Sequence, residues 1–402
     1  MTVVVAVYGG NTSGKDRERK CWVCAVLVAA RRHFCGRRVP FLFAYRADVS
    51  IYMRFRAEEY ARIDSFTINR PGGVMSMQAL VLRQHNGPLE LTELPRPEPA
   101  RGEVLVRIAA SGLNPLDTKI RAGAAGHAKH PLPAVLGIDM TGVVDTVGAG
   151  VDRFKAGDQV YGMTGGVGGL QGSLAQYASV DADLLALKPS NLSMREAAAL
   201  PLAFITAYSG IVDRAHLQAG QTVLVHGGAG GVGYVCVQLA LALGGKVFTT
   251  VSERDRSVVE ALGARPIDYR AQSVEQYVQS ATDGVGFDLV VDTVGGTTLD
   301  ASFAAVRHFG HVVSALGWGT HALAPLSFRE ATYSGVFTLH ALLSGKGRAH
   351  HGEMLRVAAR LAEENRLAPR LDARRFDLGS AQLAYEALAD GSARGKVVVE
   401  VN

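Results

Sequence analysis

The stretch HGGAGGVG, residues 226–233, decides how this chain folds. It follows the apolar run 222–225 and precedes the apolar sequence YVCVQLA. Gly228, Gly230 and Gly233 match the spacing G-x-G-x-x-G between an expected strand and an expected helix. Glycines at this spacing allow a tight turn, a close approach of backbone N–H groups to phosphate, and close packing of helix on strand. The stretch therefore predicts a dinucleotide-binding turn rather than a flexible linker.

Strands alternate with helical segments on both sides of this turn. The expected strands are 222–225, 247–251, 287–291 and 311–315, with helices reaching Leu243 and Leu262. Such alternation indicates right-handed βαβ units and a parallel sheet covered by helices on both faces. The predicted fold class is therefore α/β, with a doubly wound parallel sheet of the Rossmann type.

The chain before this region has a different pattern. From Met77 to about Lys188, short strands are broken by Gly, Pro and Asp, which indicates a unit like a β-barrel. The glycine-rich segment 162–172 is expected to be a loop over a cleft. Near the C-terminus an amphipathic helix is expected at 352–365, and the strand 395–401 is expected to return to the barrel.

Length and composition limit the classes of protein. A chain of 402 residues suggests about two domains, and 48% hydrophobic with 20% charged residues is ordinary for a soluble globular protein. No apolar stretch reaches 18 residues, so no membrane span is expected.

The basic character of the chain lies in its first 74 residues. They hold 13 of the 42 Lys and Arg and 6 of the 37 Asp and Glu, which leaves a net charge of −2 for the rest. The body therefore gives no electrostatic reason to expect nucleic acid as a partner. Its one cysteine, Cys236, fits a reduced cytoplasmic protein without a disulfide framework or a cysteine-based zinc site.

Residues 1–74 are predicted to be an N-terminal extension that is disordered or not native. They show no sustained hydrophobic period, whereas alternating strand patterns begin directly after Met75 and Met77, either of which is the expected biological start. Two other interpretations stay open: a mitochondrial targeting role, and a redox or metal motif at Cys21 and Cys24.

Four segments carry a resemblance to a known family. They are GIDMTGVVDTVGAGVDRFKAGDQVYG (137–162), AAALPLAFITAYSGI (197–211), VLVHGGAGGVGYVCVQLA (223–240) and FDLVVDTVGG (287–296). From about Met77 onward the chain resembles the zinc-independent medium-chain dehydrogenase/reductase superfamily, in its NADPH:quinone oxidoreductase, or zeta-crystallin-like, branch. The resemblance implies a GroES-like domain from residues 75–198 and 341–402, a Rossmann NADP-binding domain from residues 199–340, and a homodimer joined at the edge of the Rossmann sheet.

The residues after the second strand of the Rossmann unit bear on the choice of cofactor. An NAD enzyme places Asp or Glu there on the ribose 2′-hydroxyl. Here the strand ends at Ser252, and Arg254 and Arg256 follow, so a hydroxyl and two cations favour the additional phosphate of NADPH. Glu253 leaves NAD open as the alternative.

The resemblance also implies the residues of the site. Asn114 and Asp117 would lie beside the nicotinamide ribose and the substrate, and Lys119, where several relatives carry Tyr, is considered as a proton donor. Asp117 has a second interpretation, as a turn residue or helix cap. The predicted cofactor-binding residues are Thr206, Gly228, Ala229, Gly230, Gly231, Val232, Gly233, Ser252, Arg256, Tyr269, Leu316, Gly317, Phe337 and Lys396.

No metal is expected. The zinc alcohol dehydrogenases of the superfamily use a Cys ligand early in the barrel and then a Gly-His-Glu segment. The corresponding segments here are GLNPLDTKIRAG (112–123) and Gly137-Ile138-Asp139, which hold neither Cys nor His. The reaction that is still expected is the transfer of a hydride to an acceptor that needs no metal.

The expected activity is the reduction of a quinone by NADPH. Two alternatives stay open: an NADPH-dependent enal or enone reductase, and a non-catalytic NADPH- or RNA-binding protein of the crystallin kind. The sequence does not separate quinone from enone reduction, since both accept hydride into a conjugated system.

Overall fold

The computed structural model describes residues 24–27, 42–45 and 75–401, and divides the chain into two compact units, Met1–Pro71 and Gly72–Asn402. In the first unit, β1 (Cys24–Leu27) pairs antiparallel with β2 (Leu42–Tyr45). The rest of the expected extension, residues 1–74, lies outside the described residues apart from these two strands, so its predicted character stays a prediction.

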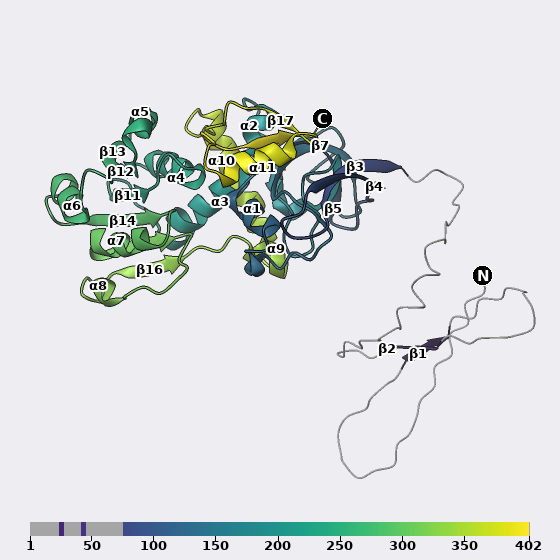
Figure 1. Cartoon of the computed structure of the whole chain (residues 1–402), viewed down its shortest axis with the longest axis horizontal. Coiled ribbons are helices and arrows are strands. Elements are labelled where there is room, and N and C mark those ends of the chain that lie inside the picture. Colours follow the sequence, from purple (N-terminus) through teal and green to yellow (C-terminus); the bar gives the residue numbers. More distant parts are fainter. Residues whose placement is uncertain (1–23, 28–41, 46–74, 402) are drawn as a thin grey trace, which may run out of the picture. The chain divides into compact units, whose positions relative to one another are not determined.

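The second unit contains a six-stranded parallel sheet in the order β13-β12-β11-β14-β15-β16 (Figure 1). This order is that of a doubly wound Rossmann sheet, and it confirms the predicted fold class. Its strands are β11 (Thr222–His226), β12 (Lys246–Val251), β13 (Arg265–Asp268), β14 (Phe287–Asp292), β15 (Val306–Ser314) and β16 (Thr332–Gly335).

Both faces of this sheet are buried. Along β11, Val223 and Val225 belong to the core shared with α4, whereas Leu224 belongs to a second core with Leu299 and Phe303 of α7. Alternate residues of a strand point to opposite faces, so an unbroken apolar run is what a strand with two covered faces requires. The helices of this part are α4 (Gly231–Ala242), η5 (Glu253–Asp255), α5 (Arg256–Glu260), α6 (Val274–Thr282), α7 (Thr297–Ala305) and α8 (Ala324–Ser327).

The barrel part is built from two sheets, β10-β8-β7-β5-β18-β17 with β9 on β5, and β4-β3-β6, in which every pair is antiparallel except the parallel pair β17–β18. Strand β18 pairs antiparallel with β5, so the end of the chain completes a sheet begun far upstream. The strands are β3 (Ser76–Leu82), β4 (Leu89–Pro95), β5 (Glu103–Gly112), β6 (Ala134–Val135), β7 (Asp139–Val147), β8 (Gln159–Met163), β9 (Tyr177–Asp181), β10 (Leu185–Leu187), β17 (Phe376–Asp377) and β18 (Val398–Glu400).

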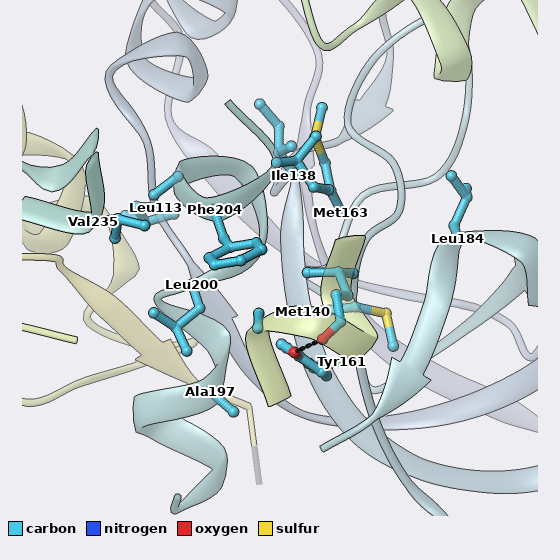
Figure 2. Packing of buried hydrophobic residues seen from close by; sticks show 14 of the residues in the cluster. Leu113, Ile138, Met140, Tyr161, Met163, Leu184, Ala197, Leu200, Phe204 and Val235 are labelled. Atoms are coloured by element: carbon cyan, nitrogen blue, oxygen red, sulfur yellow. Dashed lines mark hydrogen bonds between the residues drawn. The ribbon is translucent and has the colours of Figure 1, made fainter. Parts of the chain in front are cut away.

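Helices join the two parts into one continuous core. Figure 2 shows Leu200, the N-cap of α3, and Phe204 of α3 between Val235 of α4 and the barrel residues Met140 and Tyr161. These helices and turns are α1 (Pro115–Arg121), η2 (Gly126–Ala128), η3 (Ala182–Leu184), α2 (Met194–Ala198), α3 (Pro201–Tyr208), η4 (Ser209–Arg214), α9 (His340–Ser344), α10 (Arg348–Glu363) and α11 (Ala381–Ala389). Within the described part of the chain, no helix combines the length and apolarity needed to cross a bilayer.

Three details differ from the expectations. The edge strands β13 and β16 were not predicted, because RPID and TYSG are short and carry no apolar run. Strand β15 begins at Val306 rather than at 311. The segment 162–172, expected to be a loop over a cleft, is instead largely buried, with Val167 fully enclosed, and none of its residues lines the main cleft.

Gly228 and Gly233, the first and third glycines of the G-x-G-x-x-G motif, are required by packing. A Cβ at Gly228 would lie 1.9 Å from the Oγ1 atom of Thr249, whose hydroxyl donates to the carbonyl of Val225 at 2.7 Å. A Cβ at Gly233 would lie 2.2 Å from the carbonyl oxygen of Gly227. Contacts this short are not tolerated, so both positions need glycine for the helix to sit on the sheet.

We expect Gly228→Ala to lower the free energy of unfolding by about 1–3 kcal/mol, because the added methyl group overpacks the turn against Thr249. Gly126→Ala is the matched control, since a Cβ there meets nothing within 4 Å. Denaturant unfolding of both variants measures the difference. Equal stability of Gly228→Ala and wild type would contradict the close packing of Gly228 against Thr249.

Candidate active site

A cleft of about 1420 Å³ runs between the barrel part and the Rossmann part. Asn114, Leu116, Lys119 and His127 line it from the barrel side. The other wall is formed at the carboxyl ends of the parallel strands, where open α/β sheets bind their ligands. The cleft therefore lies where the fold predicts a cofactor and a substrate to meet.

Most of the predicted site residues line this cleft, and four do not. Asp117, Gly228, Arg256 and Gly317 are not among its lining residues. Those that line it are Asn114, Lys119, Thr206, Ala229, Gly230, Gly231, Val232, Gly233, Ser252, Tyr269, Leu316, Phe337 and Lys396. The barrel and Rossmann candidates, far apart in the sequence, are therefore brought to one cavity.

The glycine turn forms a cradle suited to a pyrophosphate. Gly230 is the N-cap of α4, and the helix begins at Gly231. The first N–H groups of an α-helix have no partner within the helix and carry a partial positive charge, which suits a phosphate. At Gly230 a Cβ would meet only the carbonyl of Gly227, at 3.2 Å, so the protein itself constrains this middle glycine least. The residues of the turn fit the phosphates of a dinucleotide.

At the end of β12 the cleft is rich in cations. The Ser252 hydroxyl donates to Asp255 Oδ2 at 3.0 Å, and Asp255 Oδ1 accepts from Arg370 at 3.0 Å. Burial works against ionisation of Asp255, but the hydrogen bonds from Arg370 and Ser252 lower its pKa, so its charge is balanced by Arg370. Arg254 and Arg270 line the same end of the cleft. Glu253 and Glu275 line the cleft as well, so a ligand here meets both guanidinium and carboxylate groups.

The structure does not bring Arg256 to this position. Its guanidinium pairs with Glu260 at 3.0 Å and Glu253 at 3.6 Å on the surface of α5. Arg254, which was expected together with Arg256, does line the cleft. Arg270 and Arg370 line it as well, and neither was predicted in this role. A signal existed for Arg270, which directly follows the predicted Tyr269, whereas Arg370 comes from a segment a hundred residues further on.

A buried polar network stands on the barrel side of the cleft. Lys396 Nζ donates to Asn114 Oδ1 at 2.5 Å, and Asn114 Nδ2 donates to Asp139 Oδ2 at 3.0 Å. Asp139 also lies 3.6 Å from Lys396 Nζ, and its Oδ1 accepts the backbone N–H of Leu202 at 2.9 Å. The amide of Asn114 is thereby fixed in one orientation at the cleft wall.

Burial changes the pKa values of the two charged groups in this network. Desolvation raises the pKa of Asp139 to about 6, with Lys396 and the hydrogen bonds of Asn114 and Leu202 opposing the rise. Desolvation likewise lowers the pKa of Lys396, while Asp139 and Asp117 oppose the fall. At neutral pH the carboxylate and the ammonium group stabilise each other's charged forms.

Asp117 faces away from the cleft and caps a helix. Its Oδ2 accepts the backbone N–H of Asn114 at 2.8 Å, and its Oδ1 is buried without a hydrogen-bond partner. Desolvation raises the pKa of Asp117 to about 7, an effect that the Asn114 N–H partly opposes. The placement matches the helix-cap interpretation, and Asp117 acts on the site by holding Asn114.

The side chains at the position that binds zinc in the zinc alcohol dehydrogenases of the superfamily do not suit zinc here. Asn114 and Asp139 stand there, and the ammonium group of Lys396 already supplies the cation between them. Structural and catalytic zinc sites draw on Cys and His. Across the ranges that the structure describes, no group of three or more His, Cys, Asp or Glu side chains could hold a metal ion.

Comparison with known proteins agrees with this architecture. A family model described as zinc-binding dehydrogenase matches residues 262–399, and one described as alcohol dehydrogenase GroES-like domain matches residues 100–190. An alcohol dehydrogenase superfamily protein from Novosphingobium aromaticivorans has 57% identity and a TM-score of 0.80, over 81% of this chain and 100% of that one.

Three curated relatives are similar along most of the described body. A 2-methylene-furan-3-one reductase of Solanum lycopersicum is 37% identical, over 75% of this chain and 73% of its own. The chloroplastic NADPH-dependent alkenal/one oxidoreductase of Arabidopsis thaliana is 35% identical, with the same two coverages. A quinone oxidoreductase of Pongo abelii is 29% identical, over 63% of this chain and 77% of its own.

The fold and the cleft thus define a dehydrogenase/reductase made of a GroES-like and a Rossmann part. The chain belongs to the medium-chain dehydrogenase/reductase superfamily and is an oxidoreductase, which confirms the family expected from the sequence. Within that family it fits the quinone oxidoreductase-like branch.

The raised pKa of Asp117 gives the protein a pH-dependent stability. Below about pH 4 the Asp117 carboxyl group is protonated in both the folded and the unfolded chain. As the pH rises to about 7, the carboxyl group loses its proton in the unfolded chain before it does so in the folded chain, so the free energy of unfolding falls. Above pH 7 the group is ionised in both states and the fall is complete.

We expect Asp117→Asn to abolish this fall, since an amide can still accept the Asn114 N–H but carries no charge. The variant should match wild type near pH 4 and gain about 1–4 kcal/mol relative to it by pH 8. Denaturant unfolding at both pH values measures the change. A difference independent of pH would show that Asp117 does not titrate in this range.

Proposed function

We propose that the protein transfers a hydride from NADPH to a quinone without zinc. The observation that carries the proposal is the joining, in one cleft, of a dinucleotide cradle at Gly230 and a wall at Asn114 whose cation is a lysine rather than a metal. A quinone needs only a hydride and a proton to become a hydroquinone, and it requires no Lewis acid for that step.

NADPH is the cofactor, and when bound it supplies the hydride. We propose that the α4 N-terminus holds its pyrophosphate and that Ser252, Arg254, Tyr269 and Arg270 hold its 2′-phosphate. The Arg270 guanidinium lies 5.5 Å from the centre of the Tyr269 ring, which restrains it at the cleft edge. Arginine and hydroxyl donors match the oxygens of a phosphate monoester.

The barrel wall would orient the reacting groups. Because Lys396 and Asp139 fix both ends of the Asn114 amide, we propose that this residue positions the nicotinamide end of the cofactor and the acceptor. Lys119 is exposed and lines the same wall, and we propose it as the proton source for the reduced acceptor.

Reduction of an enal or enone is the second candidate function. It is favoured by the higher identities, 37% and 35%, to relatives whose names denote reduction of a methylene-furanone and of alkenals or enones. Both candidates use the same cofactor and cleft, so they differ only in the acceptor. A non-catalytic role is not proposed, because the family is one of oxidoreductases.

We propose in addition a homodimer joined at β16, the edge strand of the parallel sheet. Phe309 and Phe328 beside this edge are 69% and 79% exposed, which is unusual for phenylalanine. Light scattering that gave the mass of one chain would contradict the dimer. The expected cytoplasmic location stays a prediction, which cell fractionation would check.

We expect Arg270→Ala to raise the KM for NADPH about tenfold or more and to leave the KM for NADH unchanged, because it removes a charge-assisted contact to the 2′-phosphate only. Arg256→Ala is the matched control, since that guanidinium pairs with Glu253 and Glu260 outside the cleft. Steady-state kinetics with both cofactors measure the effect. A loss in Arg256→Ala but not in Arg270→Ala would reverse the assignment.

The proposed activity is tested by NADPH oxidation with 1,4-benzoquinone and with an enal, each before and after treatment with a chelator and each repeated with NADH. Quinone turnover that prefers NADPH and survives chelation is expected. Turnover confined to the enal would establish the second candidate. Loss of turnover on chelation, with recovery on added zinc, would contradict the metal-free mechanism.

A further inference from the structure

Three aromatic rings meet where the two parts of the enzyme face each other across the cleft. His127 comes from η2 of the barrel, and Trp318 and Phe337 come from loops that follow β15 and β16 of the Rossmann sheet. The His127 ring centre lies 5.0 Å from that of Trp318, with 33° between the planes, and 6.0 Å from that of Phe337. All three side chains line the cleft.

Much of this aromatic surface is open. Trp318 is 54% exposed and Phe337 is 44% exposed, although large apolar side chains are normally covered. Val336, next to Phe337 in the chain, and Leu116 and Leu202 line the same cavity and add apolar surface to it. Exposed apolar surface at the edge of a cleft indicates a binding surface for an apolar ligand.

The loop that carries Trp318 is held in place. The backbone N–H of Trp318 donates to the backbone carbonyl of Leu316 at 2.8 Å. The backbone carbonyl of Trp318 accepts a hydrogen bond from His321 Nε2 at 3.1 Å. His321 Nδ1 in turn donates to Asp300 Oδ1 at 2.8 Å, from α7. The indole is therefore presented on a braced turn, and little ordering is needed when a ring binds to it.

We propose that Trp318, with His127 and Phe337, is a stacking clamp that selects electron acceptors carrying a planar, fused aromatic ring system. This inference rests on the proposed function, because it names the acceptor class of the same cleft. A flat, fused ring system can stack in an offset arrangement over most of the open indole surface, whereas a single small ring covers less of it. The clamp would thus favour polycyclic over monocyclic quinones.

The kinetic test compares 9,10-phenanthrenequinone with 1,4-benzoquinone at saturating NADPH. We expect Trp318→Ala to lower kcat/KM for the polycyclic acceptor about tenfold and to change that for benzoquinone less than about threefold. Trp318→Phe should restore most of the loss. Leu323→Ala is the control, because Leu323 is an exposed apolar residue of the same loop that does not line the cleft.

An equal loss with both acceptors in Trp318→Ala would overturn the proposal, since it would mean that the rings only hold the two walls together. No change with either acceptor would overturn it as well. Absence of any turnover by wild type would instead contradict the proposed function, so binding is measured separately.

The chain has two tryptophans, Trp22 and Trp318, so Trp22→Phe leaves Trp318 as the fluorescent reporter. We expect 9,10-phenanthrenequinone, added without cofactor, to quench this variant along a saturable curve. In the matched variant Trp318→Phe, which keeps Trp22, quenching should be linear and unsaturable. Unsaturable quenching in both variants would overturn the clamp, whatever the turnover assay shows.

Discussion

The contact between Gly228 and Thr249 is the constraint on which the rest of the structure depends. Only a residue without a Cβ lets the backbone leave β11 this close to β12, and only then can α4 begin at Gly231 above the sheet. That start leaves the first N–H groups of α4 directed at the cleft. The same close packing thus serves stability and creates a helix N-terminus that a phosphate can recognise.

The barrel wall depends on a second constraint, the buried network of Lys396, Asn114 and Asp139. These residues come from the C-terminal segment, the start of α1 and the start of β7, and Asp139 also holds the N–H of Leu202 near the start of α3. Charges buried this deeply are tolerated only when they are paired and hydrogen-bonded, so loss of any one would leave the others unsatisfied. The network therefore ties the C-terminal segment to the barrel segments that carry Asn114 and Asp139, and it fixes this wall of the cleft.

The site was only partly predictable, for identifiable reasons. The glycine turn and Ser252 could be placed because strand ends and turns are local features of sequence, whereas Tyr269 was expected from the family resemblance. Arg256 was expected in the cleft, yet Glu253 in η5 and Glu260 at the end of α5 hold it on the surface. Short edge strands such as β13 escaped detection, because they acquire their pairing from the sheet rather than from a hydrophobic pattern of their own.

The sequence by itself determined the class of fold, since the alternation of strands and helices around residues 226–233 and the apolar runs of β11 and β14 follow from local geometry and burial. Only the tertiary structure decided that Arg370 reaches the cleft and pairs with Asp255, and that His127 meets Trp318. Those outcomes depend on side-chain directions and on contacts between segments a hundred or more residues apart. No local pattern encodes such contacts, because they arise only when the barrel and the Rossmann sheet are packed together.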